Sequence, residues 1–271
     1  MSNQEQAIHV ADLFSLKGKT ALITGGSSGI GLMIAQGFLE SGVRVYISSR
    51  KKDVCDQVAK ELSAIGPCVS IPADVSTARG RKTLVDELSE REDNLSILVN
   101  NAGANWGAPI EDYPDEAFDK VMTLNVNSVF SLTRDLLPML EKSGTTEDPA
   151  RVINIGSMDG IHVPVAQETG TYAYSASKAA VHHLTRALAV DLASRNITVN
   201  AIAPGFFHSK MTKFVLEKHI DNIIGQCPLN RVGLPAEMAG IAIYLASRAG
   251  AYTNGTVIPV DGGTHLSKMK S

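Results

Sequence analysis

The stretch TALITGGSSGIG, residues 20–31, decides the fold of this chain. Its first five residues form a short apolar run rich in β-branched side chains, which is typical of a strand buried on both faces of a parallel sheet. Four glycines follow within the next seven residues, and a helical pattern begins among them. The stretch therefore predicts a strand, a tight turn and a helix, the opening unit of an α/β chain.

The glycine-rich turn is typical of a nucleotide site, because the amide groups at a helix N-terminus attract phosphate. Gly25 and Gly29 would let the backbone approach a pyrophosphate, and Gly31 would let the helix pack closely on the sheet. A strand-to-helix turn that binds no ligand would also suit several glycines, so the turn alone leaves this alternative open. The predicted cofactor residues of the turn are Gly25, Ser27, Ser28, Gly29, Ile30 and Gly31.

The rest of the chain repeats the alternation of short apolar runs and longer amphipathic segments. This repetition implies right-handed crossovers and predicts a doubly wound, Rossmann-type parallel sheet of about seven strands with helices on both faces. We expect one domain at residues 16–271, after a loosely ordered N-terminal segment at residues 1–15. The predicted strands are residues 20–24, 43–48, 68–73, 96–100, 151–157, 198–204 and 256–260.

Composition excludes several classes of protein. A net charge of -3 without a basic block argues against a nucleic-acid partner or an anionic membrane surface. No apolar run approaches the roughly 20 residues of a membrane span, and the polar start lacks the pattern of a signal peptide, so we expect a cytoplasmic protein without a membrane partner. Cys55, Cys68 and Cys227 form no CxxC pair and have no histidine array nearby. We expect buried or half-buried free thiols, no disulfide framework and no metal site.

The end of the second predicted strand, SSRK at residues 48–51, bears on the choice of cofactor. In such folds an acidic side chain here binds the ribose 2′-hydroxyl of NAD, whereas an arginine suits the 2′-phosphate of NADP. Ser49 occupies the acidic position and Arg50 follows it, so we expect NADP(H). The alternative is that Arg50 is a solvated surface charge.

Tyr174 and Lys178 lie four residues apart in TYAYSASKAAVHHL, so on a helix they share one face. Beside an oxidised nicotinamide, two cations would stabilise tyrosinate and bring the tyrosine pKa toward the working range. In the reducing direction Tyr174 would protonate the developing alkoxide, while Ser157, at the end of a predicted strand, would polarise the carbonyl. An ordinary helix surface is the alternative. Tyr172 lies off this face, and packing or surface roles are expected for the adjacent His182 and His183.

Several motifs in the same order resemble the short-chain dehydrogenase/reductase family, from about Leu16 to Gly263: TGGSSGIG, NNAG at residues 100–103 and YSASK at residues 174–178. The resemblance implies a catalytic tetrad of Asn125, Ser157, Tyr174 and Lys178, in which the asparagine holds a water of a proton relay. Ser209 stands where the family usually has a threonine beside the nicotinamide carboxamide. The further cofactor contacts that it implies are Asp74, Val75, Asn101, Ala102, Gly103, Tyr174, Lys178, Pro204, Gly205 and Ser209.

Within the family, the chain is most similar to bacterial NADPH-dependent β-ketoacyl reductases, especially the type associated with rhamnolipid-producing bacteria. NNAGANWGAPIEDYP, NITVNAIAPGFFHSKMT and IPVDGG carry this likeness. It implies reduction of 3-oxoacyl thioesters, on coenzyme A or an acyl carrier protein, and a homotetramer built on the helices Asp115–Glu141 and Tyr174–Arg195 and on the C-terminal strand. Reduction or oxidation of a sugar, steroid or polyol, and NADP sensing without turnover, are the alternatives.

Two loops are expected to line the substrate side, at residues 158–171 and 206–225. Their apolar residues would suit an acyl chain, although ordinary loop packing would account for them as well: Met158, Ile161, Val163, Phe206, Phe207 and Met211. A carrier protein with an acidic helix would need basic residues at the rim, and the candidates are Lys210, Lys213 and Lys218, which solvation alone would also account for.

Overall fold

The computed structural model describes residues 9–164, 169–209 and 211–267. Seven strands form one sheet in the order β3-β2-β1-β4-β5-β6-β7, and every neighbouring pair is parallel. The strands are β1 (Thr20–Thr24), β2 (Arg44–Ser48), β3 (Cys68–Ser70), β4 (Ile97–Asn100), β5 (Ala150–Ile155), β6 (Ile197–Pro204) and β7 (Val257–Val260). The predicted doubly wound parallel sheet is confirmed. Because the strand order reverses between β1 and β4, the ligand crevice of such a sheet falls at their carboxyl ends.

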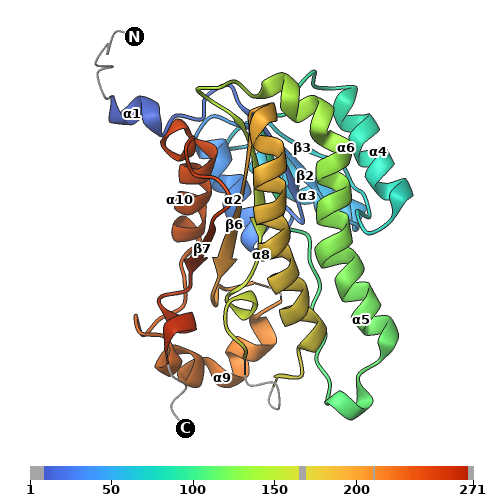
Figure 1. Cartoon of the computed structure of the whole chain (residues 1–271), viewed down its shortest axis with the longest axis vertical. Coiled ribbons are helices and arrows are strands. Elements are labelled where there is room, and N and C mark those ends of the chain that lie inside the picture. Colours follow the sequence, from blue (N-terminus) through green and yellow to red (C-terminus); the bar gives the residue numbers. More distant parts are fainter. Residues whose placement is uncertain (1–8, 165–168, 210, 268–271) are drawn as a thin grey trace.

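Helices cover both faces of the sheet (Figure 1). The helices α2 (Gly29–Glu40), α3 (Lys52–Leu62) and α10 (Pro235–Ala246) pack their apolar residues on one face. The other face carries α4 (Ala78–Ser89), α6 (Ser128–Ser143) and α8 (Tyr172–Leu192). Within the described residues, the other α-helices whose bounds are given are α1 (Val10–Leu13), α5 (Asp115–Met122) and α9 (Lys213–Gln226). Each buried side of a strand thus has a helical layer against it, which accounts for the continuous apolar runs in the sequence.

The predicted helix Asp115–Glu141 is interrupted. It consists of α5, a π-helical turn at Thr123–Asn127 and α6, which continues to Ser143. The buried Asn125 lies within the π turn, and its amide bonds to groups outside the helix. Single π turns within helices are frequent at functional sites, because the extra residue turns a side chain to a direction that a regular helix would not give it.

The other bounds differ from the predictions by a few residues. The predicted strand at residues 68–73 ends at Ser70, because Ser70 lies opposite Ile47 and its partner β2 itself ends at Ser48. All three cysteines are free and buried, as predicted. Among the residues described, no helix is long and apolar enough to cross a membrane. That part of the chain also contains no group of three or more His, Cys, Asp or Glu side chains able to hold a metal ion.

Candidate active site

Two adjoining cavities open at the carboxyl edge of the sheet, with volumes of about 200 and 150 Å³. Gly25, Ser28, Ala102 and Gly103 lie on the walls of both. Of the predicted residues, the larger cavity has Gly25, Ser28, Gly29, Ile30, Asn101, Ala102, Gly103, Ser157, Tyr174, Lys178, Pro204, Gly205 and Ser209 on its walls. The smaller has Gly25, Ser27, Ser28, Ser49, Arg50, Asp74, Val75, Ala102 and Gly103. Only Gly31 and Asn125 of the predicted set line neither cavity.

The backbone angles and close contacts of the turn after β1 require glycine at three positions. Gly25 and Gly29 have positive φ angles of 65° and 55°, which glycine adopts without strain. A Cβ atom on Gly31 would lie 2.5 Å from the Gly25 carbonyl oxygen and from Nδ2 of Asn101. Gly31 therefore lets helix α2 begin directly beneath the turn, although its own atoms do not face the cavity.

A threonine at the end of β1 organises this turn. The Oγ1 of Thr24 accepts hydrogen bonds from the backbone amides of Asn101 and Ala102, both at 3.0 Å. In return, Nδ2 of Asn101 donates to the carbonyls of Thr24 and Gly25, at 2.9 and 3.2 Å. The glycine turn and the segment after β4 are thus held together as one cradle. Sequence reasoning overlooked Thr24, although a hydroxyl at the last strand residue before the glycines was the available signal.

The smaller cavity ends at the residues after β2, and these fit a phosphorylated ribose. The Oγ atoms of Ser48 and Ser49 are buried and have no hydrogen-bond partner in the protein, so both are available to a ligand. The exposed Arg50 lies on the same wall, and the segment from Ser48 to Lys51 contains no carboxylate that would repel a phosphate. Donor hydroxyls beside a guanidinium favour a 2′-phosphate over a free 2′-hydroxyl.

Ser157, Tyr174 and Lys178 meet on the wall of the larger cavity. Ser157 Oγ accepts a hydrogen bond from the backbone amide of Asp159 at 3.1 Å, and it lies close enough to the Tyr174 hydroxyl to lower the pKa of that hydroxyl. The Lys178 ammonium group lies 5.5 Å from the centre of the Tyr174 ring and donates to the Ile155 carbonyl at 2.7 Å. The predicted pair thus shares one face of α8, turned toward the end of β5.

Burial sets the protonation of this group. Burial raises the pKa of Tyr174 to about 12. Ser157 lowers this pKa in part, whereas the charge of Asp159 raises it. Burial lowers the pKa of Lys178 to about 8, which the charge of Asp159 opposes. In the protein alone, Tyr174 is therefore a proton donor. The lowered tyrosine pKa expected beside an oxidised nicotinamide is not produced by the chain's own groups.

Asn125 lies behind the cavity wall. Its Oδ1 accepts from the Ala104 amide at 2.8 Å, and its Nδ2 donates to the Ala104 carbonyl and to Ser177 Oγ, both at 2.9 Å. A Cβ atom on Gly103 would lie 3.3 Å from Asn125 Oδ1 and 3.8 Å from Lys178 Nζ. The amide thus braces the segment after β4 against α8, with Gly103 between it and the lysine.

The segment after β6 closes the cavity. Pro204, Gly205 and Ser209 lie on the wall, and the Cβ of Ser209 faces Gly29 across it. Thr212 adds a hydroxyl beside Ser209, with 3.0 Å between Oγ1 and Oγ, and donates to the Phe207 carbonyl at 2.6 Å. The sequence pattern pointed to Ser209 alone, because Thr212 is brought beside it only by the turn of the chain.

The expected substrate walls are only partly buried. Met158 and Phe207 are buried, whereas half of Met211 and most of Val163 are exposed. Residues 165–168 of the first loop and Lys210 lie outside the described residues. Lys213 forms an ion pair with Glu217 at 3.7 Å, so this rim lysine is already partnered. A further cavity of about 570 Å³ lies on the other side of Phe207, between α9, the start of α10 and the end of β7.

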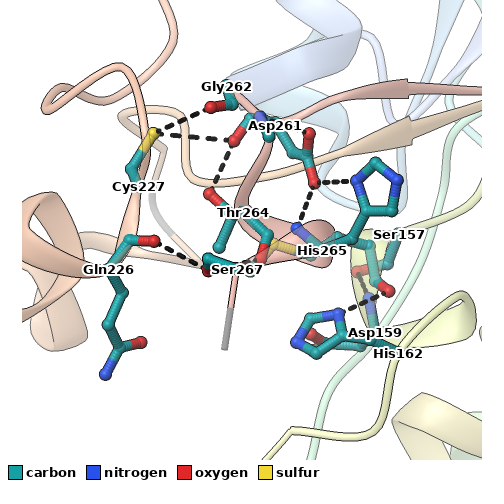
Figure 2. Close-up of polar contacts among 12 residues, drawn as sticks. Ser157, Asp159, His162, Gln226, Cys227, Asp261, Gly262, Thr264, His265 and Ser267 are labelled. Atoms are coloured by element: carbon teal, nitrogen blue, oxygen red, sulfur yellow. Dashed lines mark hydrogen bonds and ion pairs between the residues drawn. The ribbon is translucent and has the colours of Figure 1, made fainter. Parts of the chain in front are cut away.

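The C-terminal turn at Thr264–Leu266 lies beside the turn that carries Ser157 and Asp159 (Figure 2). Asp261 holds it, since its Oδ2 accepts from the backbone amide and Nδ1 of His265 at 2.8 and 2.7 Å. Ser267 Oγ donates to the Gln226 carbonyl at the end of α9, at 2.9 Å. The chain's last described residues thus connect the end of α9 to a turn that lies beside the one carrying Ser157, an arrangement that no local sequence motif indicates.

The strand order, the glycine cradle and the Ser157–Tyr174–Lys178 group define a dinucleotide-binding α/β protein of the Rossmann type. A family model described as enoyl-(acyl carrier protein) reductase matches residues 25–265. The Diaporthe leptostromiformis protein named short-chain dehydrogenase/reductase PhomF is 34% identical over an alignment of 278 positions that covers 93% of this chain and 93% of the relative. The chain belongs to the short-chain dehydrogenase/reductase family.

Two comparisons narrow the position within the family. The Pseudomonas aeruginosa protein named rhamnolipids biosynthesis 3-oxoacyl-(acyl-carrier-protein) reductase is 51% identical over 255 residues, 93% of this chain and 98% of the relative. The solved Pseudomonas aeruginosa RhlG/NADP active-site complex has a TM-score of 0.91 and 50% identity, covering 96% of this chain and 100% of that one. The predicted likeness to the rhamnolipid-associated reductases is confirmed.

Proposed function

We propose that the protein is an NADPH-dependent reductase that converts 3-oxoacyl thioesters to 3-hydroxyacyl thioesters. The observation that carries this proposal is the likeness along 93% of the chain to a 3-oxoacyl-(acyl-carrier-protein) reductase. The site supports the proposal, because the phenol of Tyr174, the hydroxyl of Ser157 and the ammonium group of Lys178 lie together on the wall of the larger cavity. A binding module without turnover would have no need of this convergence.

NADP(H) is the proposed cofactor. The glycine cradle and the amides at the start of α2 would hold the pyrophosphate, while Ser48, Ser49 and Arg50 would hold the 2′-phosphate. Asp74 and Val75 would flank the adenine, and Pro204, Gly205 and Ser209 the nicotinamide. The chemistry that NADPH supplies when bound is a hydride for the carbonyl carbon of the substrate.

Ser157 and Tyr174 act on the oxygen of that carbonyl. The Ser157 hydroxyl donates a hydrogen bond to it and polarises it. As negative charge develops on the oxygen, Tyr174 transfers its phenolic proton, which burial keeps in place at neutral pH. Both hydroxyls lie on the wall of the same cavity, so both can reach the reacting oxygen from one side.

Lys178 and Asn125 support this acid. The ammonium group of Lys178 stabilises tyrosinate once the proton has left, and its bond to the Ile155 carbonyl would exchange for one to the cofactor ribose. Asn125 holds the Ala104 segment beside the lysine, where water of a proton relay would return the proton to Tyr174. Tyr174 is thus the proton donor and Ser157 polarises the carbonyl, while Lys178 supplies the positive charge and Asn125 holds the neighbouring backbone in place.

An acyl thioester is the proposed substrate class, and an acyl carrier protein the proposed partner. The segment after β6 supplies apolar surface at Phe207 and Met211 on the cavity wall, which suits an alkyl chain. A homotetramer is the proposed assembly: Phe118, Phe130 and Val190 leave apolar surface exposed on α5, α6 and α8. The cytoplasm is the proposed compartment, since all three cysteines are free thiols.

The test is NADPH oxidation, followed by loss of absorbance, with 3-oxoacyl thioesters of increasing length on coenzyme A and on acyl carrier protein. Simple ketones, keto sugars and ketosteroids form the comparison panel, and each assay is repeated with NADH. We expect turnover of the thioesters with NADPH and little with NADH. Turnover of only the comparison ketones would refute the thioester assignment, and binding of NADPH without any turnover would refute the reductase.

A further inference from the structure

Three side chains of α8 point to the turn that follows β5. Tyr174, Lys178 and His182 are spaced by four residues and therefore lie on one face of the helix. Tyr174 lies with Ser157 on the wall of one cavity, and Lys178 donates to the Ile155 carbonyl. The proposed chemistry gives roles to these two, whereas His182 is buried next to the same turn without a part in it.

The imidazole ring of His182 packs against the backbone of two glycines, Gly156 and Gly160. A Cβ atom on Gly156 would overlap Nε2 of the ring, and one on Gly160 would lie 2.7 Å from its Cε1. The imidazole is only 4% exposed, so its fit against the two backbones leaves no room for water between them. Glycine at both positions is therefore what allows the turn to lie flat against α8.

The ring also faces the backbone at both ends of the turn. The Ser157 backbone amide donates to Nε2 at 3.4 Å, so the ring proton is on Nδ1. The backbone of Gly160 also lies against the ring, and its amide is already used by the Ser157 carbonyl, so the Gly160 carbonyl is the group there that can accept from Nδ1. Burial lowers the pKa of His182 to about 4, and the neutral ring keeps an acceptor and a donor at physiological pH.

We propose that His182 is a positioning residue for Ser157, because it fastens the turn from Gly156 to Gly160 to α8 and thereby keeps the Ser157 hydroxyl in register with that of Tyr174. The inference rests on the proposed function, in which Ser157 polarises the substrate carbonyl. A turn that could rock away from α8 would keep the cofactor cradle intact, since the cradle is built on β1 and β4. The defect would therefore fall on the chemical step.

Two variants separate the bond to Ser157 from simple packing. The oxygen of glutamine reaches the position of Nε2, whereas the amide of asparagine reaches only that of Nδ1. We expect His182→Asn to lower kcat about ten- to hundredfold, with KM for NADPH unchanged, and His182→Gln to restore most of the loss. His183→Asn, at the exposed neighbouring position, is the matched control and should keep the parent kcat. Equal kcat for the two His182 variants would overturn the proposal.

A double-mutant cycle tests whether His182 acts through Ser157. In a Ser157→Ala background, His182→Asn should cause less than about a twofold further loss of kcat, because there is no hydroxyl left to position. The same fold loss in both backgrounds would overturn the inference while the proposed function stood. If Ser157→Ala alone kept the parent kcat on 3-oxoacyl thioesters, the proposed role of Ser157 would fail and the inference with it. Thermal unfolding and NADPH titration of each variant confirm that it is folded.

Discussion

The cofactor side and the substrate side of the crevice are built by different means. On the cofactor side, backbone groups meet at close range: glycines at Gly25, Gly29 and Gly31, and the bonds between Thr24 and Asn101. On the substrate side, side chains from the turn after β5 and from the segment between β6 and α9 form the walls, among them Ser157, Phe207 and Met211, and half of Met211 is exposed. Backbone geometry admits one residue type at each place, whereas an apolar wall admits many. The first side is therefore specified tightly by sequence and the second loosely.

The largest expected effect separates chemistry from binding. Tyr174→Phe removes the proton donor without altering the glycine cradle, so kcat should fall about 10²- to 10⁴-fold, while NADPH affinity stays within about twofold of the parent. Stopped-flow oxidation of NADPH and fluorescence titration measure the two quantities. Tyr172→Phe is the matched control, since that ring packs on Tyr113 and is off the catalytic face. Comparable rates for Tyr174→Phe and the parent would remove Tyr174 from the mechanism.

Adding one methyl group at Gly31 should disrupt the packing on the cofactor side of the crevice. Gly31→Ala places Cβ 2.5 Å from the Gly25 carbonyl, so we expect a loss of about 2–3 kcal/mol in the free energy of unfolding, together with weaker NADPH binding. Gly240→Ala, in helix α10, is the control, because a Cβ there meets nothing within 4 Å. That change should be neutral or stabilising by up to about 1 kcal/mol in urea unfolding. Equal stability of the two variants would contradict the close packing of α2 beneath the turn.

The choice of cofactor should depend on one exposed charge. Arg50→Asp replaces the guanidinium beside the unpaired Ser48 and Ser49 hydroxyls with a group that repels phosphate. The ratio of kcat/KM for NADPH to that for NADH should fall about ten- to hundredfold. Lys60→Asp makes the same change of charge at an exposed position further along α3 and should leave the ratio unchanged. A ratio that survived Arg50→Asp would mean that Arg50 is only a surface charge.

The smallest expected effect is a gain in stability. Burial lowers the pKa of Lys178 from 10.5 to about 8, so at neutral pH the folded protein carries a poorly solvated charge. Lys178→Met should raise the free energy of unfolding at pH 7 by about 1–2 kcal/mol, although it abolishes turnover. Between pH 8 and 10.5 the unfolded parent retains the proton that the folded parent has lost, so the parent gains stability and the advantage of the variant disappears.

Urea unfolding of the parent and Lys178→Met across that pH range measures the difference directly. A constant difference at every pH would show that the charge of Lys178 is not the cause. A lower stability of the variant at pH 7 would show that the bond from Lys178 to the Ile155 carbonyl outweighs the cost of burying the charge.

The sequence predicted the sheet and most of the crevice, because both depend on short local patterns. Buried parallel strands are apolar runs, and several glycines between a strand and a helix are typical of a turn that binds phosphate. The missed features depend on distant contacts or on a side chain's surroundings. Thr212 meets Ser209 through a turn of the chain. The Asp261–His265 pair holds a C-terminal turn that lies beside the turn of Ser157, and His182 looked like a packing or surface residue.

The π turn at Thr123–Asn127 has a consequence for insertions and deletions. Buried residues recur every four positions, at Ala117, Val121, Asn125 and Val129. This spacing looks like that of one continuous α-helix, so the sequence does not indicate the π turn. Loss of a single codon within the turn would leave an equally plausible helix of regular pitch, yet it would rotate α5 by about 100° relative to α6. Asn125 or its replacement would then face away from Ala104. Natural length variation at this point should therefore be far rarer than substitution, and a one-residue deletion library across α5 and α6 would reveal it as an intolerant site.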